Sequence, residues 1–309
     1  MQRTADIQKL SHKYLPTNFV ITDWASLEPF FKELNDRPIP SVEALEAWLT
    51  DLSELEACIS EDACWRQIKM TCDTTDKSLE DAFTFFCMEI QPKIQPYADA
   101  LNKKLIQSPF TAKLDQGKYH TYLRSVQKSI ELFRTENIPI QAELSVLQQQ
   151  YGVIAGKMTI EVGGKEYTLQ QAAQFLENED RAFREEVYRK IQTRRLQDQE
   201  AMHDLFTSLI QKRHQVALNA GFENYRDYKF AELGRFDYTK EDCFQFHDAV
   251  KLHVMPLIEK IYTRKKEKLG VDALKPWDLE AEPAGTKPLR PFTDGKDLYE
   301  KSVACFEQV

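Results

Sequence analysis

Residues 180–221 read DRAFREEVYRKIQTRRLQDQEAMHDLFTSLIQKRHQVALNAG, and this stretch decides the fold. Apolar side chains recur near its start at helical spacing: Phe183, Val187 and Ile191. Residues 194–200 are almost wholly polar, so we expect them either to face solvent or to line a water-filled space. The pattern predicts one long helix over residues 180–220, with Gly221 just past its end, where glycine is favoured.

Similar periodicity predicts helices along most of the chain. The expected segments are 23–34, 41–59, 62–71, 76–90, 96–105, 118–136, 140–152, 239–270 and 294–309. We expect breaks before Pro92 and at Ile138-Pro139, because proline pushes the residue before it out of the helical region. Pro256 is expected to kink its helix. Only ten glycines occur in 309 residues, which also favours helix.

The clearest β pattern covers residues 157–169. Apolar and polar residues alternate on both sides of Gly163-Gly164, and a two-residue Gly-Gly link of this kind is typical of a β-hairpin. Thr168-x-x-Gln171 predicts a capping box for the helix that follows. The fold class is therefore mainly α, a multi-helix shell with one small β-hairpin. We expect an N-terminal helical domain over residues 1–150 and a second domain over residues 151–309.

The composition indicates an ordinary globular protein, with 42% hydrophobic and 29% charged residues. The net charge of −8, without a dominant basic stripe, argues against a nucleic-acid partner. Apolar runs are too short for a bilayer, and no secretory signal follows Met1, so we expect no membrane association. Six cysteines without a Cys-x-x-Cys pair indicate reduced thiols and a cytoplasmic location.

The C-terminal part of the chain changes character after Gly270. Four prolines within residues 276–291 predict an extended connector. The last amphipathic segment starts near Asp294 and ends on an apolar position at Val309, without a glycine stop. We therefore expect a truncated chain or an isolated fragment.

The histidines do not form a recognisable metal-binding pattern. A zinc-binding helix needs two histidines four residues apart, on one face. The six histidines are His12, His120, His203, His214, His247 and His253. No two are four apart, and none is followed by glutamate. The sequence also contains no Gly-x-Ser-x-Gly elbow. We assign no catalytic, cofactor-binding or metal residue, and we expect His247 to be a core or boundary histidine.

Several short motifs nevertheless occur in a characteristic order. They are Leu15-Pro16-x-Asn18-Phe19, Asp180-Arg181-x-x-Arg184, Gly221-Phe222-x-Asn224-Tyr225 and Pro276-Trp277-Asp278. Each is weak alone, but the ordered series, spread over nearly the whole chain, resembles the oligoendopeptidase F branch of the thimet-oligopeptidase family of zinc metallopeptidases.

The resemblance implies a complete protein that hydrolyses short peptides inside a channel. Zn²⁺ would be held by a His-Glu-x-x-His helix and a later glutamate, and the motif glutamate would act as general base. None of these positions matches a residue of this chain. We therefore expect the chain alone to be inactive, to bind no Zn²⁺, and to pair with a remaining C-terminal catalytic portion. The alternative is a non-catalytic helical module that binds peptides or proteins.

Overall fold

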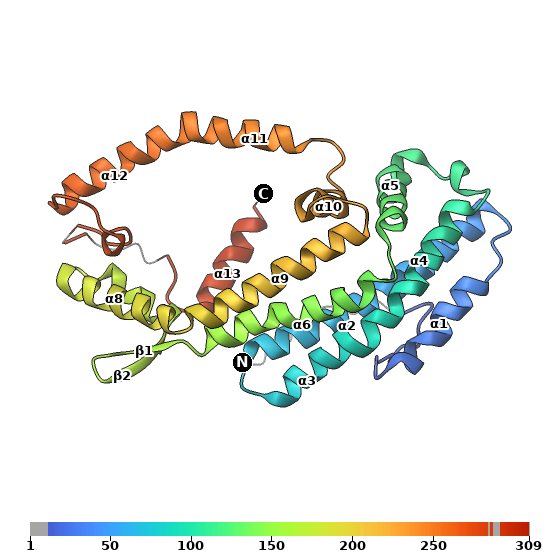
Figure 1. Ribbon diagram of the computed structural model, residues 1–309, viewed down its shortest axis with the longest axis horizontal. Coiled ribbons are helices and arrows are strands. Elements are labelled where there is room, and N and C mark those ends of the chain that lie inside the picture. The colour runs from blue at the N-terminus through green and yellow to red at the C-terminus, as the bar shows by residue number, and fades with distance from the viewer. Residues whose placement is uncertain (1–11, 284, 287–290, 309) are drawn as a thin grey trace. The chain divides into compact units, whose positions relative to one another are not determined.

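The computed structural model describes residues 12–283, 285–286 and 291–308. These residues form a mainly helical protein with one two-stranded antiparallel sheet, so the predicted fold class is confirmed (Figure 1). Part of the predicted N-terminal arm, together with Pro288 and Val309, lies outside the described residues.

The chain forms two compact units, and each of them is discontinuous in sequence. Unit 1 contains residues 1–158 and 197–243, and unit 2 contains residues 159–196 and 244–309. The division into domains at residue 150 remains a prediction.

Unit 1 begins with a layer of helices around a buried aromatic and leucine core. Its elements are α1 (Trp24–Asp36), α2 (Val42–Cys72), α3 (Lys77–Phe85), the π-helical turn η1 (Phe86–Ile90), α4 (Gln91–Gln107), the 3₁₀ turn η2 (Thr111–Lys113) and α5 (Gln116–Leu132). Asp23 and Ser41 cap α1 and α2 by accepting hydrogen bonds from backbone amides of the first turn. Trp48 and Phe31 are among the largest side chains fully buried between these helices.

One expected interruption is absent, because the chain continues as helix past Pro92. The segments 41–59 and 62–71 form one helix, α2, in agreement with the expected continuation of helix over residues 62–71. Pro92 falls in the first turn of α4, directly after η1, where its missing amide hydrogen costs little. Pro139 likewise lies in the first turn of α6 (Asn137–Gly156), so the break at Ile138-Pro139 marks the start of a helix.

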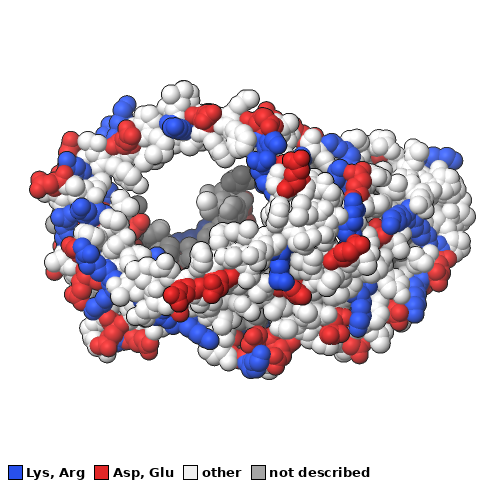
Figure 2. All heavy atoms as spheres, viewed as in Figure 1, with Lys and Arg blue, Asp and Glu red and all other residues white. Residues whose placement is uncertain are grey.

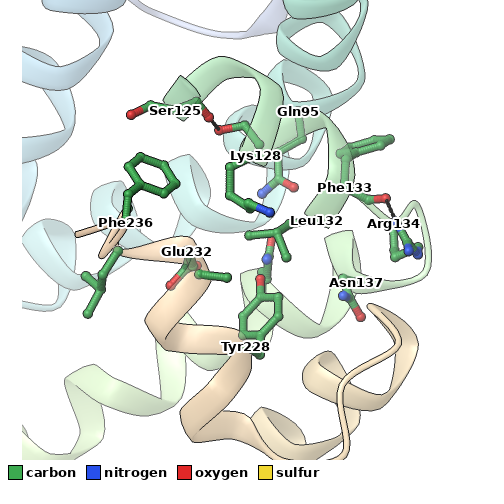
Figure 3. A pocket seen from close by; sticks show the side chains of 15 residues that line it. Gln95, Ser125, Lys128, Leu132, Phe133, Arg134, Asn137, Tyr228, Glu232 and Phe236 are labelled. Carbon is green, nitrogen blue, oxygen red and sulfur yellow. Dashed lines mark hydrogen bonds between the residues drawn. The ribbon is translucent and has the colours of Figure 1, made fainter. Parts of the chain in front are cut away.

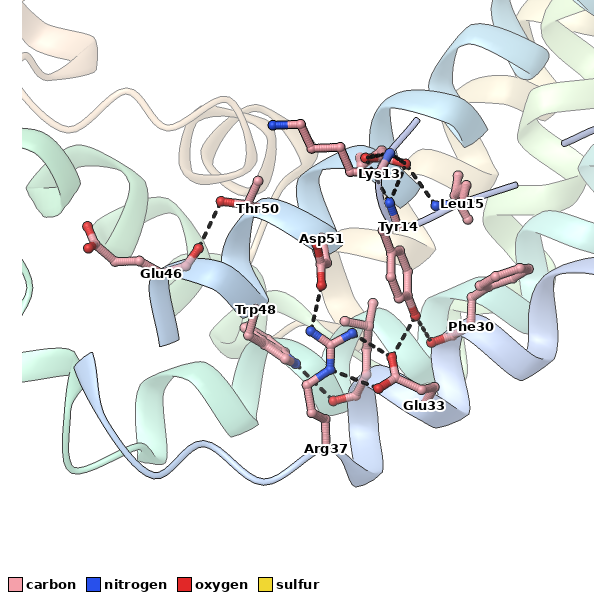
Figure 4. A network of polar contacts seen from close by, with 12 residues as sticks. Lys13, Tyr14, Leu15, Phe30, Glu33, Arg37, Glu46, Trp48, Thr50 and Asp51 are labelled. Atoms are coloured by element: carbon pink, nitrogen blue, oxygen red, sulfur yellow. Dashed lines mark hydrogen bonds and ion pairs between the residues drawn. The ribbon is translucent and has the colours of Figure 1, made fainter. Parts of the chain in front are cut away.

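A polar network fixes the chain before α1 to α1 and α2 (Figure 4). Arg37 donates hydrogen bonds to Glu33, one turn earlier, and to Asp51 of α2, the latter at 2.6 Å. The Tyr14 hydroxyl lies 2.9 Å from Glu33 Oε2. Glu54 accepts from the backbone amides of residues 13–15, which orders the entry of the chain into the core.

In the second part of unit 1, α9 (Gln199–Asn219) packs against both α6 and α10 (Tyr225–Glu232). Figure 1 shows α6 and α9 running side by side. Buried Asn137 donates to the Val216 carbonyl at 3.0 Å and accepts from the Asn219 amide at 2.7 Å. Gly221 ends this segment with φ of +86°, as its predicted place after a helix requires.

The single long helix predicted over residues 180–220 is wrong. It is two helices, α8 (Arg181–Gln197) and α9, which meet at Asp198 with φ −102° and ψ 15°. No residue from 192 to 204 is buried, so no packing holds a continuous helix across this polar stretch. The chain passes from unit 2 to unit 1 here.

Unit 2 starts with the predicted hairpin. Strands β1 (Thr159–Val162) and β2 (Lys165–Thr168) pair antiparallel, with Val162 opposite Lys165 across the Gly163-Gly164 turn. Thr168 and Gln171 form the predicted capping box at the start of α7 (Leu169–Ala173), which leads into the 3₁₀ turn η3 (Gln174–Glu177). The strand residues Ile160 and Val162 pack on Val187 and Ile191 of α8 in one small core.

The rest of unit 2 is built from helices with little burial. They are α11 (Lys240–Ala249), which begins in unit 1, the π-helical turn η4 (Val250–Val254), α12 (Met255–Leu269), the 3₁₀ turn η5 (Pro276–Asp278) and α13 (Gly295–Phe306). The π turn ends at Val254, two residues before Pro256. Gly270 ends α12 with φ of +63°, as predicted. The predicted start of the last helix is also confirmed, because Asp294 caps α13.

Candidate functional site

The Asp-Arg-x-x-Arg motif and the Pro-Trp-Asp motif meet inside unit 2. Asp180 accepts from the Ala182 amide at the start of α8, which fixes where that helix begins. Arg181 and Arg184, three residues apart, therefore lie on the same helix face. Both reach Asp278 at the end of η5, and Asp278 is fully buried.

Arg184 is the centre of this cluster. Its guanidinium donates to Asp278 Oδ1 at 2.9 Å and to the Trp277 carbonyl at 2.9 Å. The same group also donates to the carbonyls of Asn178 and Glu179 at 2.7 and 3.0 Å. Only 3% of the Arg184 side chain is exposed. One buried side chain thus holds the segment before α8 and the η5 turn together.

Both carboxylate oxygens of Asp278 accept two hydrogen bonds each. Its Oδ1 accepts from Arg181 Nε at 3.0 Å as well as from Arg184, and its Oδ2 accepts from Arg181 Nη2 and from the Lys275 amide. Burial alone would raise the pKa of this carboxyl, but the hydrogen bonds from Arg181, Lys275 and Arg184 hold its pKa down at about 2. A carboxylate with all its acceptor sites occupied is suited neither to accept a proton from a substrate nor to bind a metal.

Trp277 completes the cluster on its outer side. Its ring lies 5.6 Å from the ring of Tyr188 and 5.2 Å from the guanidinium carbon of Arg189, both on α8. The motifs therefore act as a clamp that ties η5 to α8. Sequence reasoning located the motifs but missed this role, for which the opposite charges of Asp278 and the two arginines were the available signal.

Unit 1 contains a polar pocket of about 300 Å³ between α4, α5, α6 and α10 (Figure 3). Its walls include Lys128, Arg134, Tyr228 and Glu232. Burial and the neighbouring Glu232 raise the pKa of the Tyr228 hydroxyl to about 12. Arg134 donates to backbone carbonyls, including that of Asn219 at 3.1 Å, and Lys128 and Glu232 each pair with a neighbour on their own helix. The charged groups of the pocket are thus engaged within the protein.

Of the six histidines, His12 lies near an acidic side chain, with its Nδ1 3.8 Å from Glu54 Oε1. Within the described part of the chain, no three His, Cys, Asp or Glu side chains are close enough to share a metal ion. The residues present therefore do not fit a zinc site, and no catalytic step through zinc can be derived from them. His247, expected in a core or boundary position, is exposed, because α11 contains no buried residue.

Comparisons with known proteins agree with this architecture. The model of the Peptidase M3 N-terminal domain matches residues 15–133, and that of Peptidase family M3 matches residues 174–299. No protein with a curated description matches the chain.

Solved structures show the same fold. A protein of Bacillus anthracis assigned as an oligoendopeptidase F aligns with a TM-score of 0.86 and 20% identity, over 94% of this chain and 54% of its own. PZ peptidase A, solved with an inhibitor, aligns with a TM-score of 0.82 and 23% identity, over 92% of this chain and 50% of its own. The chain spans about half the length of these structures.

Two family models in consecutive order, which together cover most of the sequence, show to which family the chain belongs. The chain belongs to the M3 family of metallopeptidases, and its fold is that of oligoendopeptidase F structures. The family predicted from the ordered motifs is confirmed.

Proposed function

We propose that this chain is the N-terminal portion of a zinc-dependent oligopeptidase of the oligoendopeptidase F branch. One observation carries the proposal: 94% of the chain aligns with little more than half of an oligoendopeptidase F structure. The consecutive order of the two family matches agrees with it. The complete protein would hydrolyse short peptides inside a channel, with Zn²⁺ activating the attacking water.

The catalytic groups would lie in the remaining C-terminal portion, and we assign none to this chain. Its own contribution is architectural. The clamp of Arg181, Arg184 and Asp278 holds η5 against α8 within unit 2. The helices of unit 1 would form a wall that restricts substrate size. We propose that the chain alone neither binds Zn²⁺ stoichiometrically nor cleaves peptides.

An apolar stripe along α11, η4 and α12 supports a further portion of the same protein as the partner. Phe246, Val254, Leu257 and Ile261 recur at spacings close to helical turns, and each is at least 42% exposed. On α13, Phe306 is 81% exposed. Contiguous apolar surface of this kind marks an interaction site, and a C-terminal portion present in the longer relatives is the occupant we propose.

Metal analysis and a peptide assay on the same preparation test the proposal. After dialysis, the purified chain should contain far less than one zinc per chain, and it should leave a quenched oligopeptide uncleaved. A zinc peptidase assayed in the same buffer is the positive control. One zinc per chain that survives dialysis, or cleavage that a chelator abolishes, would overturn the proposed inactivity.

The coding sequence beyond codon 309 separates the two functions. A His-Glu-x-x-His motif in that sequence supports the oligopeptidase. An immediate stop codon supports instead a non-catalytic helical module that binds peptides or proteins, for which the same apolar stripe would be the binding surface.

We also propose a cytoplasmic protein without a nucleic-acid or membrane partner. Figure 2 shows Lys and Arg interspersed with Asp and Glu over the visible face, rather than gathered into a basic stripe. Among the described residues, no helix is long and apolar enough to cross a bilayer.

A further inference from the structure

A second cavity in unit 1, of about 460 Å³, has a composition quite different from that of the polar pocket. It lies between α1, α2, α3, η1, α4 and α6, and most of its walls are apolar. Phe31, Phe83, Phe86 and Ile94 are among the side chains that form them. A volume and lining of this kind are typical of sites for small organic molecules.

One charged group lines this cavity. Glu56 of α2 is the only charged residue among the lining side chains, which are otherwise apolar, Ser, Gln or Cys. Among the described residues its carboxylate takes part in no hydrogen bond or ion pair, and its negative charge helps to raise the pKa of the nearby Tyr122 hydroxyl. Glu56 retains solvent exposure, so a ligand can reach it. The surrounding side chains remove water from around the Glu56 carboxyl, and this desolvation raises its pKa.

Part of the cavity wall departs from regular α-helix. Phe86 and Cys87 belong to the π-helical turn η1, and π turns inside helices are frequent at functional sites. Burial raises the pKa of the Cys87 thiol to about 11, so this group lines the cavity as an inert apolar surface. The cavity is thus suited to non-covalent binding.

We propose that this cavity binds a compact apolar cation, a hydrocarbon body that carries one protonated amine paired with Glu56. The apolar walls would take up the hydrocarbon. A protonated amine would form an ion pair with this carboxylate at the edge of the apolar surface, whereas an anion would be repelled and a neutral ligand would gain no ion pair. The site is independent of the proposed peptidase function.

Two probes of equal size test the charge requirement. Calorimetric titration of the 309-residue chain at pH 7 with 4-phenylbutylamine, which is protonated, should give a Kd below about 1 mM. The neutral 4-phenylbutan-1-ol should bind at least about 10-fold more weakly. Equal affinity for both probes, or no binding of the amine to a folded chain, would overturn the proposal.

Variants locate the binding. Glu56→Gln should remove the preference for the amine and leave the affinity for the alcohol unchanged. Glu61→Gln, on the same helix but outside the cavity, is the matched control and should bind both probes like the unmodified chain. Ala63→Leu, which places a larger side chain in the cavity, should weaken the binding of both probes. Circular dichroism and the unfolding midpoint check that each variant folds. An amine preference that survives in Glu56→Gln would assign the binding to another place.

Discussion

Arg184 and Asp278 lie 94 residues apart in the sequence, yet Arg184 Nη2 donates a 2.9 Å hydrogen bond to Asp278 Oδ1 in the interior of unit 2. The two side chains are 3% and 0% exposed. Burying an ion pair costs desolvation, which is offset only when further hydrogen bonds complete both partners. Arg184 has three additional carbonyl acceptors and Asp278 three additional donors, so removal of either partner should be costly.

Replacement of Asp278 by alanine should lower the free energy of unfolding of unit 2 by about 3 kcal/mol, because it leaves the Arg184 guanidinium buried without its counter-ion. Glu280→Ala is the control, since this exposed residue is two positions away and should change stability by less than about 0.5 kcal/mol. Chemical denaturation followed by circular dichroism measures both. A loss of unfolding free energy in Asp278→Ala no larger than that of the control would contradict a stabilising role of the clamp.

The two arginines of the clamp should differ in their tolerance of lysine. Arg184→Lys should destabilise unit 2 by about 2 kcal/mol, because one ammonium cannot reproduce a guanidinium that donates to four acceptors. Arg181→Lys should cost less than about 1 kcal/mol, since 44% of that side chain is exposed. The midpoints of thermal unfolding of the two variants are compared. A lower midpoint for Arg181→Lys than for Arg184→Lys would show that Arg181 contributes more to the stability of the clamp.

The clamp should also weaken in acid. The pKa of Asp278 falls from 3.8 to about 2 on folding, so its ionised form contributes about 2 kcal/mol of stability above pH 4. The sign follows from the lowered pKa: the contribution is lost as pH falls from about 4 to 2. Denaturation of the unmodified chain and of Asp278→Asn at several pH values measures the difference. The gap in stability between them should narrow below pH 4.

Two glycines should respond to alanine with opposite signs. Gly221 has φ of +86° with no atom near an added Cβ, so Gly221→Ala should cost about 1 kcal/mol through backbone strain alone. Gly152 lies inside α6, also in open space, and Gly152→Ala should stabilise the chain by about 0.5–1 kcal/mol. Unfolding curves of the two variants and of the unmodified chain test this prediction. If the unfolding midpoints of both variants shift in the same direction, the difference in φ does not decide the sign of the change in stability.

Local sequence rules predicted those features whose determinants lie close together in the chain. The hairpin at 157–169, its capping box at Thr168 and the stops at Gly221 and Gly270 follow from a few adjacent residues. The same rules failed at Pro92 and at Asp198. At Pro92 a first helical turn accepts proline, and at Asp198 a polar stretch receives no support from packing. Both outcomes depend on what surrounds the residue.

The sequence by itself determined the helical class, the hairpin and the family, because periodic apolar residues, glycines and ordered motifs are read along the chain. Only the tertiary structure decided what the motifs do. Asp278 becomes a clamp because folding brings it to Arg181 and Arg184, and Glu56 lines an apolar cavity because several helices close around it. Burial and partner choice arise from contacts between distant segments, and those contacts set the pKa values and the binding chemistry.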